Sequence, residues 1–132
     1  MSKNVIIIGG TGHLGISLGN YLIKKNFNVF ITTRKKKNKL NKLFNHNASL
    51  YNLNIYNKIQ IKRILQVVKP LLVFYFAGQS LPDKSFKKKY ETYKSNVIGC
   101  KNFLDIIKKY NIKCKFIYPA SSEMYGKIKG KI

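Results

Sequence analysis

Short apolar runs alternate with longer stretches that have helical spacing along this chain. A continuous β-branched run at residues 5–8 is typical of a strand buried in a parallel sheet, and the pattern predicts further strands at residues 27–33, 49–53, 71–76 and 113–118. Apolar residues recur with helical spacing over 16–25, 58–68 and 86–110, while residues 38–47 read as a polar, partly helical connection. This order predicts a doubly wound α/β fold with about five parallel strands and right-handed crossovers.

The helix predicted over residues 86–110 has one polar exception on its apolar face. We expect this face to contain Tyr90, Tyr93, Val97, Leu104 and Ile107. Asn96 lies among these residues, and a buried asparagine needs hydrogen-bond partners. We therefore expect Asn96 to tie this helix to a strand end beside a ligand site.

Glycines with a regular spacing follow the first apolar run. The segment is Gly9-Gly10-Thr11-Gly12-His13-Leu14-Gly15, and a predicted helix comes directly after it. A bare backbone at a helix N-terminus lets phosphate oxygens approach N–H groups, and strand–glycine loop–helix is the context of Rossmann-like dinucleotide binding. The alternative is an ordinary glycine-rich turn.

The residues after the second predicted strand bear on which dinucleotide would bind. Thr33 and Arg34 lie there, and no carboxylate occurs from residue 26 through residue 57. An acidic residue at this place binds the ribose hydroxyls of NAD, whereas a basic one accommodates the 2′-phosphate of NADP. The guanidinium of Arg34 suits a phosphate, so the sequence favours NADP over NAD. A solvated lysine run is the alternative for Lys36 and Lys37.

Small residues end the fourth predicted strand. Phe76 is followed by Ala77, Gly78, Gln79 and Ser80, a composition that would let a ribose or a nicotinamide ring pack on the backbone. A simple strand-to-loop turn is the alternative.

Composition limits the remaining classes of function. The 132 residues suffice for one domain, and no apolar run reaches the roughly 18 residues of a membrane span. The two cysteines, Cys100 and Cys114, have no metal-like spacing and are expected to be reduced, with a disulfide as the alternative. With no signal-like segment before the first strand, the expected location is cytoplasmic, with no metal and no membrane partner.

The net charge of +22 suggests a polyanion partner when it is considered alone. The excess is almost all lysine, and Ile, Asn, Lys and Tyr are enriched together. This joint enrichment is typical of a compositional drift of a whole proteome. We therefore do not expect nucleic acid to be the partner, although a polyanion-binding protein remains an alternative hypothesis.

Five ordered segments carry a resemblance to a known family. They are Gly9–Gly15, Asn52-Leu53, Ala77-Gly78-Gln79-Ser80, Asn96-Val97-x-Gly99 and Ser121-Ser122-Glu123-Met124-Tyr125-Gly126. With these segments the chain resembles the extended short-chain dehydrogenase/reductases, which are NAD(P)-dependent epimerases and dehydratases of sugar nucleotides. Within that family it looks most like the GDP-mannose 4,6-dehydratases.

The resemblance implies a dehydratase (lyase) reaction on a nucleotide sugar such as GDP-mannose. In such enzymes NADP accepts a hydride from C4 of the hexose while a tyrosine acts as base. A glutamate then removes the C5 proton, water leaves from C6, and the hydride returns to C6. By position, Ser121 would hydrogen-bond the sugar O4 and Glu123 would be the C5 base. A capping role for Ser121 and a surface role for Glu123 are the alternatives.

The resemblance also assigns cofactor contacts by position. Gly9 to Gly15 would hold the pyrophosphate, Arg34 and Lys35 the 2′-phosphate, and Phe76 to Ser80 the ribose and nicotinamide side. Asn52 and Leu53 stand where the family usually has Asp-Leu beside the adenine, so Asn52 loses a charge there but keeps hydrogen-bonding ability. The dehydratases usually carry a histidine where this chain has Leu81, and this difference weakens the case for GDP-mannose as the substrate.

The family's Tyr-x-x-x-Lys pair lies about one helix beyond the Ser-x-Glu segment. Residues 125–129 spell this pattern, but Gly126 and Gly130 disfavour the helix that the pair requires. We therefore expect residues 1–132 to be an incomplete NAD(P)-binding domain, a fragment or a truncated gene product, inactive by itself and open to homo-oligomer formation. A fragment of a sugar-nucleotide epimerase or reductase and a stand-alone NADP(H)-binding module are the alternatives.

Overall fold

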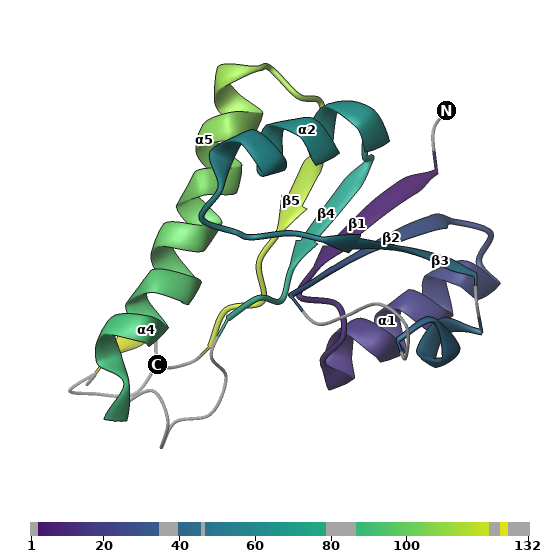
Figure 1. Cartoon of the computed structure of the whole chain (residues 1–132), viewed down its shortest axis with the longest axis horizontal. Helices are drawn as coiled ribbons and strands as arrows, with labels where there is room; N and C mark the ends of the chain where they lie inside the picture. The colour runs from purple at the N-terminus through teal and green to yellow at the C-terminus, as the bar shows by residue number, and fades with distance from the viewer. Residues whose placement is uncertain (1–2, 35–39, 46, 79–86, 122–124, 127–132) are drawn as a thin grey trace.

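Five parallel strands form one sheet in the order β3-β2-β1-β4-β5 in the computed structural model, which describes residues 3–34, 40–45, 47–78, 87–121 and 125–126 (Figure 1). The strands are β1 (Asn4–Ile8), β2 (Asn28–Thr33), β3 (Ala48–Asn52), β4 (Leu72–Tyr75) and β5 (Lys115–Ile117). All five predicted strands are present, with ends that differ by one or two residues. The predicted doubly wound, Rossmann-like fold is confirmed.

The central strand β1 explains why a continuous apolar run was needed. Val5 to Ile8 are all fully buried, because β1 pairs with β2 on one side and β4 on the other while helices cover both faces. Successive side chains point to opposite faces. Ile6 and Ile8 belong to one hydrophobic cluster, and Val5 and Ile7 belong to another.

Helices cover the two faces unequally (Figure 1). On one face α1 (His13–Lys24) and the short helix η2 (Asn41–Phe44) pack together over β1 and β2, with Phe44 fully buried. On the other face α2 (Lys58–Val68) packs beside α5 (Cys100–Lys109). Helix α1 begins at His13 rather than at the predicted Ile16, because the glycine loop passes directly into the helix.

The long helix predicted over 86–110 contains an irregular middle. Its described part consists of α4 (Lys89–Tyr93), the π-helix η3 (Lys94–Gly99) and α5. A π-helix bonds residue i to i+5, so it adds a residue per turn and rotates the side chains that precede it relative to those that follow. The prediction of one regular α-helix was therefore wrong.

The face that this helical segment buries also differs from the predicted one. Of the expected apolar face, Ile107 packs against the core, whereas four members are 45–70% exposed, namely Tyr90, Tyr93, Val97 and Leu104. The buried positions are Gly99, Asn102, Phe103 and Ile106. The π-helix contributes to this difference by rotating Tyr90 and Tyr93 relative to α5, because the prediction assumed a uniform helical period, whereas Leu104 lies on the exposed side of α5 itself.

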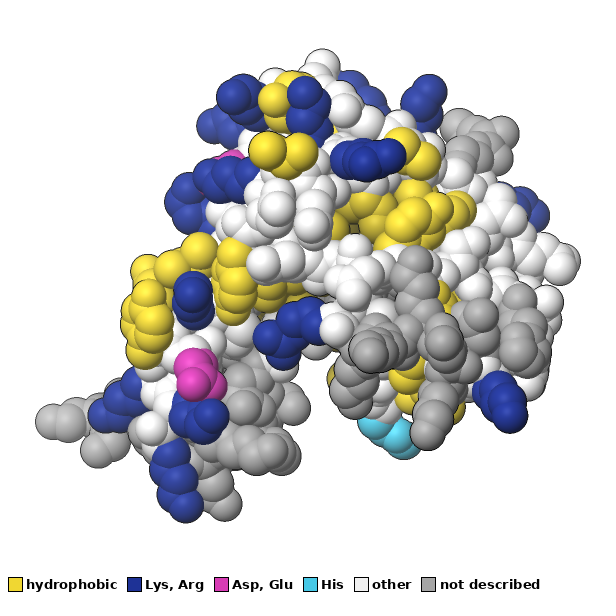
Figure 2. Space-filling model, viewed as in Figure 1, with side chains coloured by type: hydrophobic (Ala, Val, Ile, Leu, Met, Phe, Trp, Pro, Cys, Tyr) yellow, Lys and Arg dark blue, Asp and Glu magenta, His cyan; other side chains and the backbone are white. Residues whose placement is uncertain are grey.

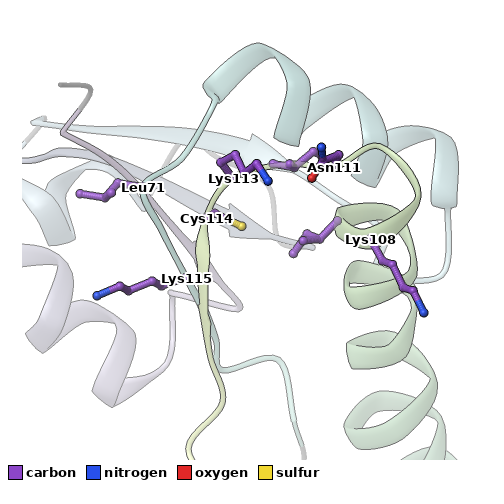
Figure 3. Close-up of a pocket in the computed structure, with 8 residues that line it drawn as sticks. Leu71, Lys108, Asn111, Lys113, Cys114 and Lys115 are labelled. Carbon is purple, nitrogen blue, oxygen red and sulfur yellow. The ribbon is translucent and has the colours of Figure 1, made fainter.

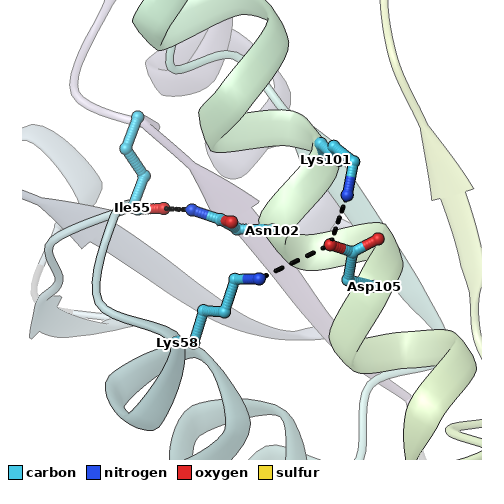
Figure 4. Close-up of polar contacts among 5 residues, drawn as sticks. All are labelled: Ile55, Lys58, Lys101, Asn102 and Asp105. Atoms are coloured by element: carbon cyan, nitrogen blue, oxygen red, sulfur yellow. Dashed lines mark hydrogen bonds and ion pairs between the residues drawn. The ribbon is translucent and has the colours of Figure 1, made fainter.

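Two polar contacts connect α5 to α2 and to the loop before α2 (Figure 4). Asn102 is buried, and its Nδ2 donates to the carbonyl oxygen of Ile55 at 3.1 Å. Asp105 lies nearer the surface, with its Oδ2 2.7 Å from Lys101 Nζ and 3.5 Å from Lys58 Nζ. The hydrogen bond from Lys101, with the nearby charge of Lys58, lowers the pKa of Asp105.

Basic side chains are spread widely over the molecule. Figure 2 shows Lys and Arg side chains over α2 and along α4 and α5, and those of the described residues form no single continuous basic patch on the visible face. This distribution gives no support to a polyanion-binding surface on that face. None of the described helices is long and apolar enough to cross a membrane. Cys100 and Cys114 are free cysteines.

Candidate functional site

The predicted site segments meet at one edge of the sheet. Because all five strands are parallel, their carboxyl ends lie at the same edge. The chain runs outward from β1 through β2 to β3, and then from β4 to β5 on the other side. Ligands of open α/β sheets bind at such a switch point, here between β1 and β4.

Close packing explains two of the glycines in the loop after β1. Gly9 has φ +71°, and a Cβ on it would lie 2.7 Å from the Cα of Ala77 at the end of β4. A Cβ on Gly15 would overlap the backbone of Gly10. These two glycines therefore let the loop, α1 and the end of β4 approach one another.

Gly12 is different, because packing within the protein does not require a glycine there. It is the N-cap of α1 with an ordinary extended backbone, φ −80° and ψ 172°, and among the described residues a Cβ on it would meet only the Gly9 oxygen, at 3.9 Å. No side chain caps this helix, although the first-turn N–H groups of a helix lack intrahelical partners. The space above Gly12, beside Thr11, His13 and Leu14, therefore suits a close-lying anion.

A buried side chain fixes the start of this loop to β2. The Gly9 N–H donates to Oγ1 of Thr32 at 3.2 Å, and Thr32 is buried. The turn is thereby held at the carboxyl end of the neighbouring strand. The next residues along β2 are Thr33, also buried, and the exposed Arg34.

Arg34 comes directly after β2, and Asn52 is the last residue of the neighbouring strand β3. Thr33 pairs with Asn52 in the parallel register, and Asn52 is exposed. Leu53 donates its N–H to the Thr33 carbonyl at 3.2 Å, while its side chain is buried in the core cluster beneath α2 and α5. The side chain of Leu53 is thus part of the core. Lys35 lies outside the described residues, so its predicted role stays a prediction.

The end of β4 lies directly beside the glycine loop. Phe76 donates its N–H to the Ile8 carbonyl at 2.8 Å, and Ala77 is the residue that a side chain on Gly9 would strike. A Cβ on Gly78 would lie 2.9 Å from Oδ1 of Asn96. Asn96 therefore meets the strand end as the sequence predicted. Gln79 and Ser80 lie outside the described residues.

The predicted catalytic segment follows β5. Ser121 is described and exposed, a few residues beyond the end of that strand. Glu123 lies outside the described residues. Both catalytic roles stay predictions.

Sequence reasoning missed the side chains beneath the π-helix. Tyr75 is buried, and its Oη donates to the Ser95 carbonyl at 2.6 Å. A Cβ on Gly99 would overlap that hydroxyl. Gly99 was visible in the sequence as part of the Asn96-Val97-x-Gly99 segment, but Tyr75 is indistinguishable from the rest of its apolar run.

A pocket of about 540 Å³ lies at the opposite, amino edge of the sheet (Figure 3). Its lining includes Lys108, Lys113 and Lys115, but the side chains of Lys108 and Lys115 point in different directions, away from Cys114. They do not converge on one anion site, and none of the lining residues was predicted to bind ligand. Among the described residues there is also no group of three His, Cys, Asp or Glu that could hold a metal ion. We therefore place the candidate site at the carboxyl edge.

The sequence matches a known family over nearly its whole length. The family described as GDP-mannose 4,6 dehydratase matches residues 6–132. The dTDP-D-glucose 4,6-dehydratase of Dictyostelium discoideum is 30% identical over 94% of this chain and 30% of its own length. The CDP-paratose 2-epimerase of Salmonella typhi is 25% identical over 92% of this chain and 38% of its own length.

Solved structures show the same fold. A UDP-glucose 4-epimerase from Thermotoga maritima, determined with UDP-glucose, is 28% identical with a TM-score of 0.81 and covers 96% of this chain and 41% of its own. The Bifidobacterium longum UDP-glucose 4-epimerase, in complex with NAD+ and UDP, has a TM-score of 0.82 at 22% identity and covers 93% and 38%. This chain therefore spans 30–41% of the length of these relatives. The chain belongs to the GDP-mannose 4,6 dehydratase family, among the nucleotide-sugar dehydratases and epimerases of the short-chain dehydrogenase/reductase type.

Proposed function

We propose that this chain binds a nicotinamide dinucleotide, NADP in preference to NAD, as the cofactor-binding portion of a nucleotide-sugar 4,6-dehydratase. The observation that carries the proposal is Gly12. Its missing side chain leaves open space at the uncapped N-terminus of α1, and no close packing against the described residues requires a glycine there. A pyrophosphate in this space would accept hydrogen bonds from first-turn N–H groups and meet the positive end of the helix dipole.

The preference for NADP rests on the strand ends beside the loop. The exposed Arg34 follows β2, and the neighbouring end of β3 carries Asn52 in place of an acid. A guanidinium can hold the 2′-phosphate of NADP through paired hydrogen bonds, whereas NAD needs a carboxylate for its ribose hydroxyls. Lys35 would add a second positive charge.

The proposed reaction is dehydration of a nucleotide sugar, with GDP-mannose as the first candidate. The bound nicotinamide would supply hydride acceptance and return. In this chain the Ser121 hydroxyl would hydrogen-bond a sugar hydroxyl, and the Glu123 carboxylate would take the proton from the adjacent carbon. Glu123 is what favours a dehydratase over an epimerase, since an epimerase needs no such base.

Titration with reduced cofactors tests the binding proposal. NADPH fluorescence should change on binding, and Arg34→Ala should weaken NADPH about tenfold, the loss of one charge-assisted contact, while leaving NADH unchanged. Arg63→Ala, an exposed arginine on α2, is the matched control and should change neither affinity. No binding by the folded wild type, or equal losses for both cofactors, would contradict the proposal.

The reaction class requires a complete enzyme. In a chimera, residues 1–132 would replace the aligned segment of the Dictyostelium dTDP-D-glucose 4,6-dehydratase. Glu123→Gln should then stop elimination of water while oxidation at C4 continues, seen as accumulation of reduced cofactor. Glu91→Gln, which alters an exposed glutamate on α4, is the control. Unchanged product formation by the Glu123 variant would exclude its role as base.

We also propose that the chain forms a homo-oligomer through the helical segment α4–η3–α5. Tyr90, Tyr93, Val97 and Leu104 are large apolar side chains exposed on this segment, and Figure 2 shows hydrophobic side chains gathered along its side. Apolar surface of this kind is typical of association sites. Sedimentation should give an assembly larger than 15.3 kDa that Tyr93→Lys reduces to monomer. A wild-type monomer at high concentration would exclude this surface.

A further inference from the structure

The π-helix η3 lies directly over the end of β4. It covers Lys94–Gly99, between two α-helical segments. Such π-segments are rare and occur mostly at functional sites, since they displace backbone groups from the regular hydrogen-bond pattern. What holds this one in place lies beneath it.

Tyr75, the last residue of β4, is the side chain that contacts the π-helix from below. It is 1% exposed, and its ring is packed edge-on against Phe103 at 5.8 Å and stacked on Tyr118 at 5.9 Å. Its Oη donates to the Ser95 carbonyl at 2.6 Å. Burial raises the pKa of the Tyr75 hydroxyl, which therefore stays protonated and can donate.

Ser95 in turn contacts Asn96, which lies at the end of β4 beside the candidate site. Oγ of Ser95 lies 2.9 Å from Oδ1 of Asn96 and 3.2 Å from the Thr92 carbonyl, so it can donate to either. Oδ1 of Asn96 in turn lies against Gly78, close enough that a Cβ there would approach it to 2.9 Å. The buried tyrosine is thus linked through two neighbouring residues of the π-helix to the loop that follows β4.

Two glycines leave room for this chain of contacts. Gly99 is buried, and a Cβ on it would overlap the Tyr75 hydroxyl and lie 2.7 Å from Cδ1 of Ile55. At the other end of these contacts, the missing side chain of Gly78 leaves room for Oδ1 of Asn96. A side chain at either glycine would push apart the groups that make these contacts.

We propose that Tyr75 and Ser95 are positioning residues that hold Asn96 at the nicotinamide half of the dinucleotide site. The proposal rests on the proposed cofactor binding. The phosphate loop follows β1, and Arg34 marks the adenosine half on the β2 side. The other half of an extended dinucleotide then lies over the end of β4, where Asn96 meets Gly78.

The test compares two ligands that differ only in the nicotinamide. These are NADPH, followed by fluorescence, and 2′-phospho-ADP-ribose, followed by calorimetry. Tyr75→Phe keeps the ring and removes the hydroxyl, so NADPH should weaken about three- to tenfold while 2′-phospho-ADP-ribose binds as before. Tyr21→Phe, an exposed tyrosine on α1, is the matched control and should change neither.

A merely structural role for Tyr75 would leave the ratio of the two affinities unchanged. Equal weakening of both ligands, or of neither, would therefore overturn the inference. Failure of the wild type to bind either ligand would instead overturn the proposed function. If Tyr75→Phe does not fold, Ser95→Ala decides, because the half-buried Ser95 hydroxyl supports Asn96 directly and its loss should weaken NADPH alone.

Discussion

The two halves of the candidate site are built by different kinds of contact. On the β1 side, backbones approach one another, with Gly15 packed against Gly10. On the β4 side, side chains make the contacts, from Tyr75 to Ser95 and then to Asn96. The first half depends on missing side chains at fixed spacing within one short segment. The second depends on side chains that meet only once the chain has folded.

The largest effect is expected where backbones touch. Gly15→Ala would force a Cβ into the backbone of Gly10, which cannot rotate away as a side chain could. We expect a loss of about 3 kcal/mol in the free energy of unfolding, or no folded protein. Urea denaturation measures this change. A variant as stable as the wild type would show that the first half does not depend on this close approach.

Gly12→Ala should separate binding from stability in that same half. Because a Cβ there meets no atom nearer than 3.9 Å, we expect a stability change of only about 0.5 kcal/mol, from the weaker N-cap. Affinity for NADPH should fall about tenfold, since the methyl group would occupy the space of the phosphate. Parallel NADPH titration and thermal unfolding check both outcomes. Unchanged affinity would show that Gly12 faces no ligand.

The smallest effect is expected at the exposed ion pair between α2 and α5. The pKa of Asp105 is lowered, so its ionised form stabilises the fold at neutral pH, and this contribution is lost progressively as the pH falls below about 4 and through the lowered pKa of the carboxyl. Asp105→Asn should therefore be slightly less stable than wild type at pH 7, and the difference should shrink as the carboxyl is protonated at lower pH. Thermal unfolding across this range measures the difference, with Glu91→Gln as the control that leaves α2 and α5 unaffected. A difference that does not shrink as the pH falls would show that Asp105 acts through packing instead.

The contrast between the halves also explains which parts of the site could be predicted from the sequence. Gly9, Gly12 and Gly15 specify their own geometry, because a strand before them and a helix after them leave few alternatives. The prediction that Asn96 lies near a strand end is confirmed by its closeness to Gly78, whereas its place beside a ligand stays a prediction.

The prediction failed where a regular period was assumed. Tyr93 and Val97 were placed on a buried face by counting helical turns, but the π-helix rotates them to the surface. Nothing in an apolar run distinguishes Tyr75, whose hydroxyl finds its partner 20 residues further along the chain. Only the folded arrangement reveals such a pair.

The position of β1 in the middle of the sheet has a consequence for how this protein is made. Val5 to Ile8 leave the ribosome before both of their strand partners, of which the second ends at Tyr75. At common synthesis rates the interval is about 3–13 s, during which an apolar segment has an unpaired edge. Such an edge can pair with other chains. The burial that makes β1 a stable central strand therefore also makes it a segment open to intermolecular pairing until β4 has been synthesised.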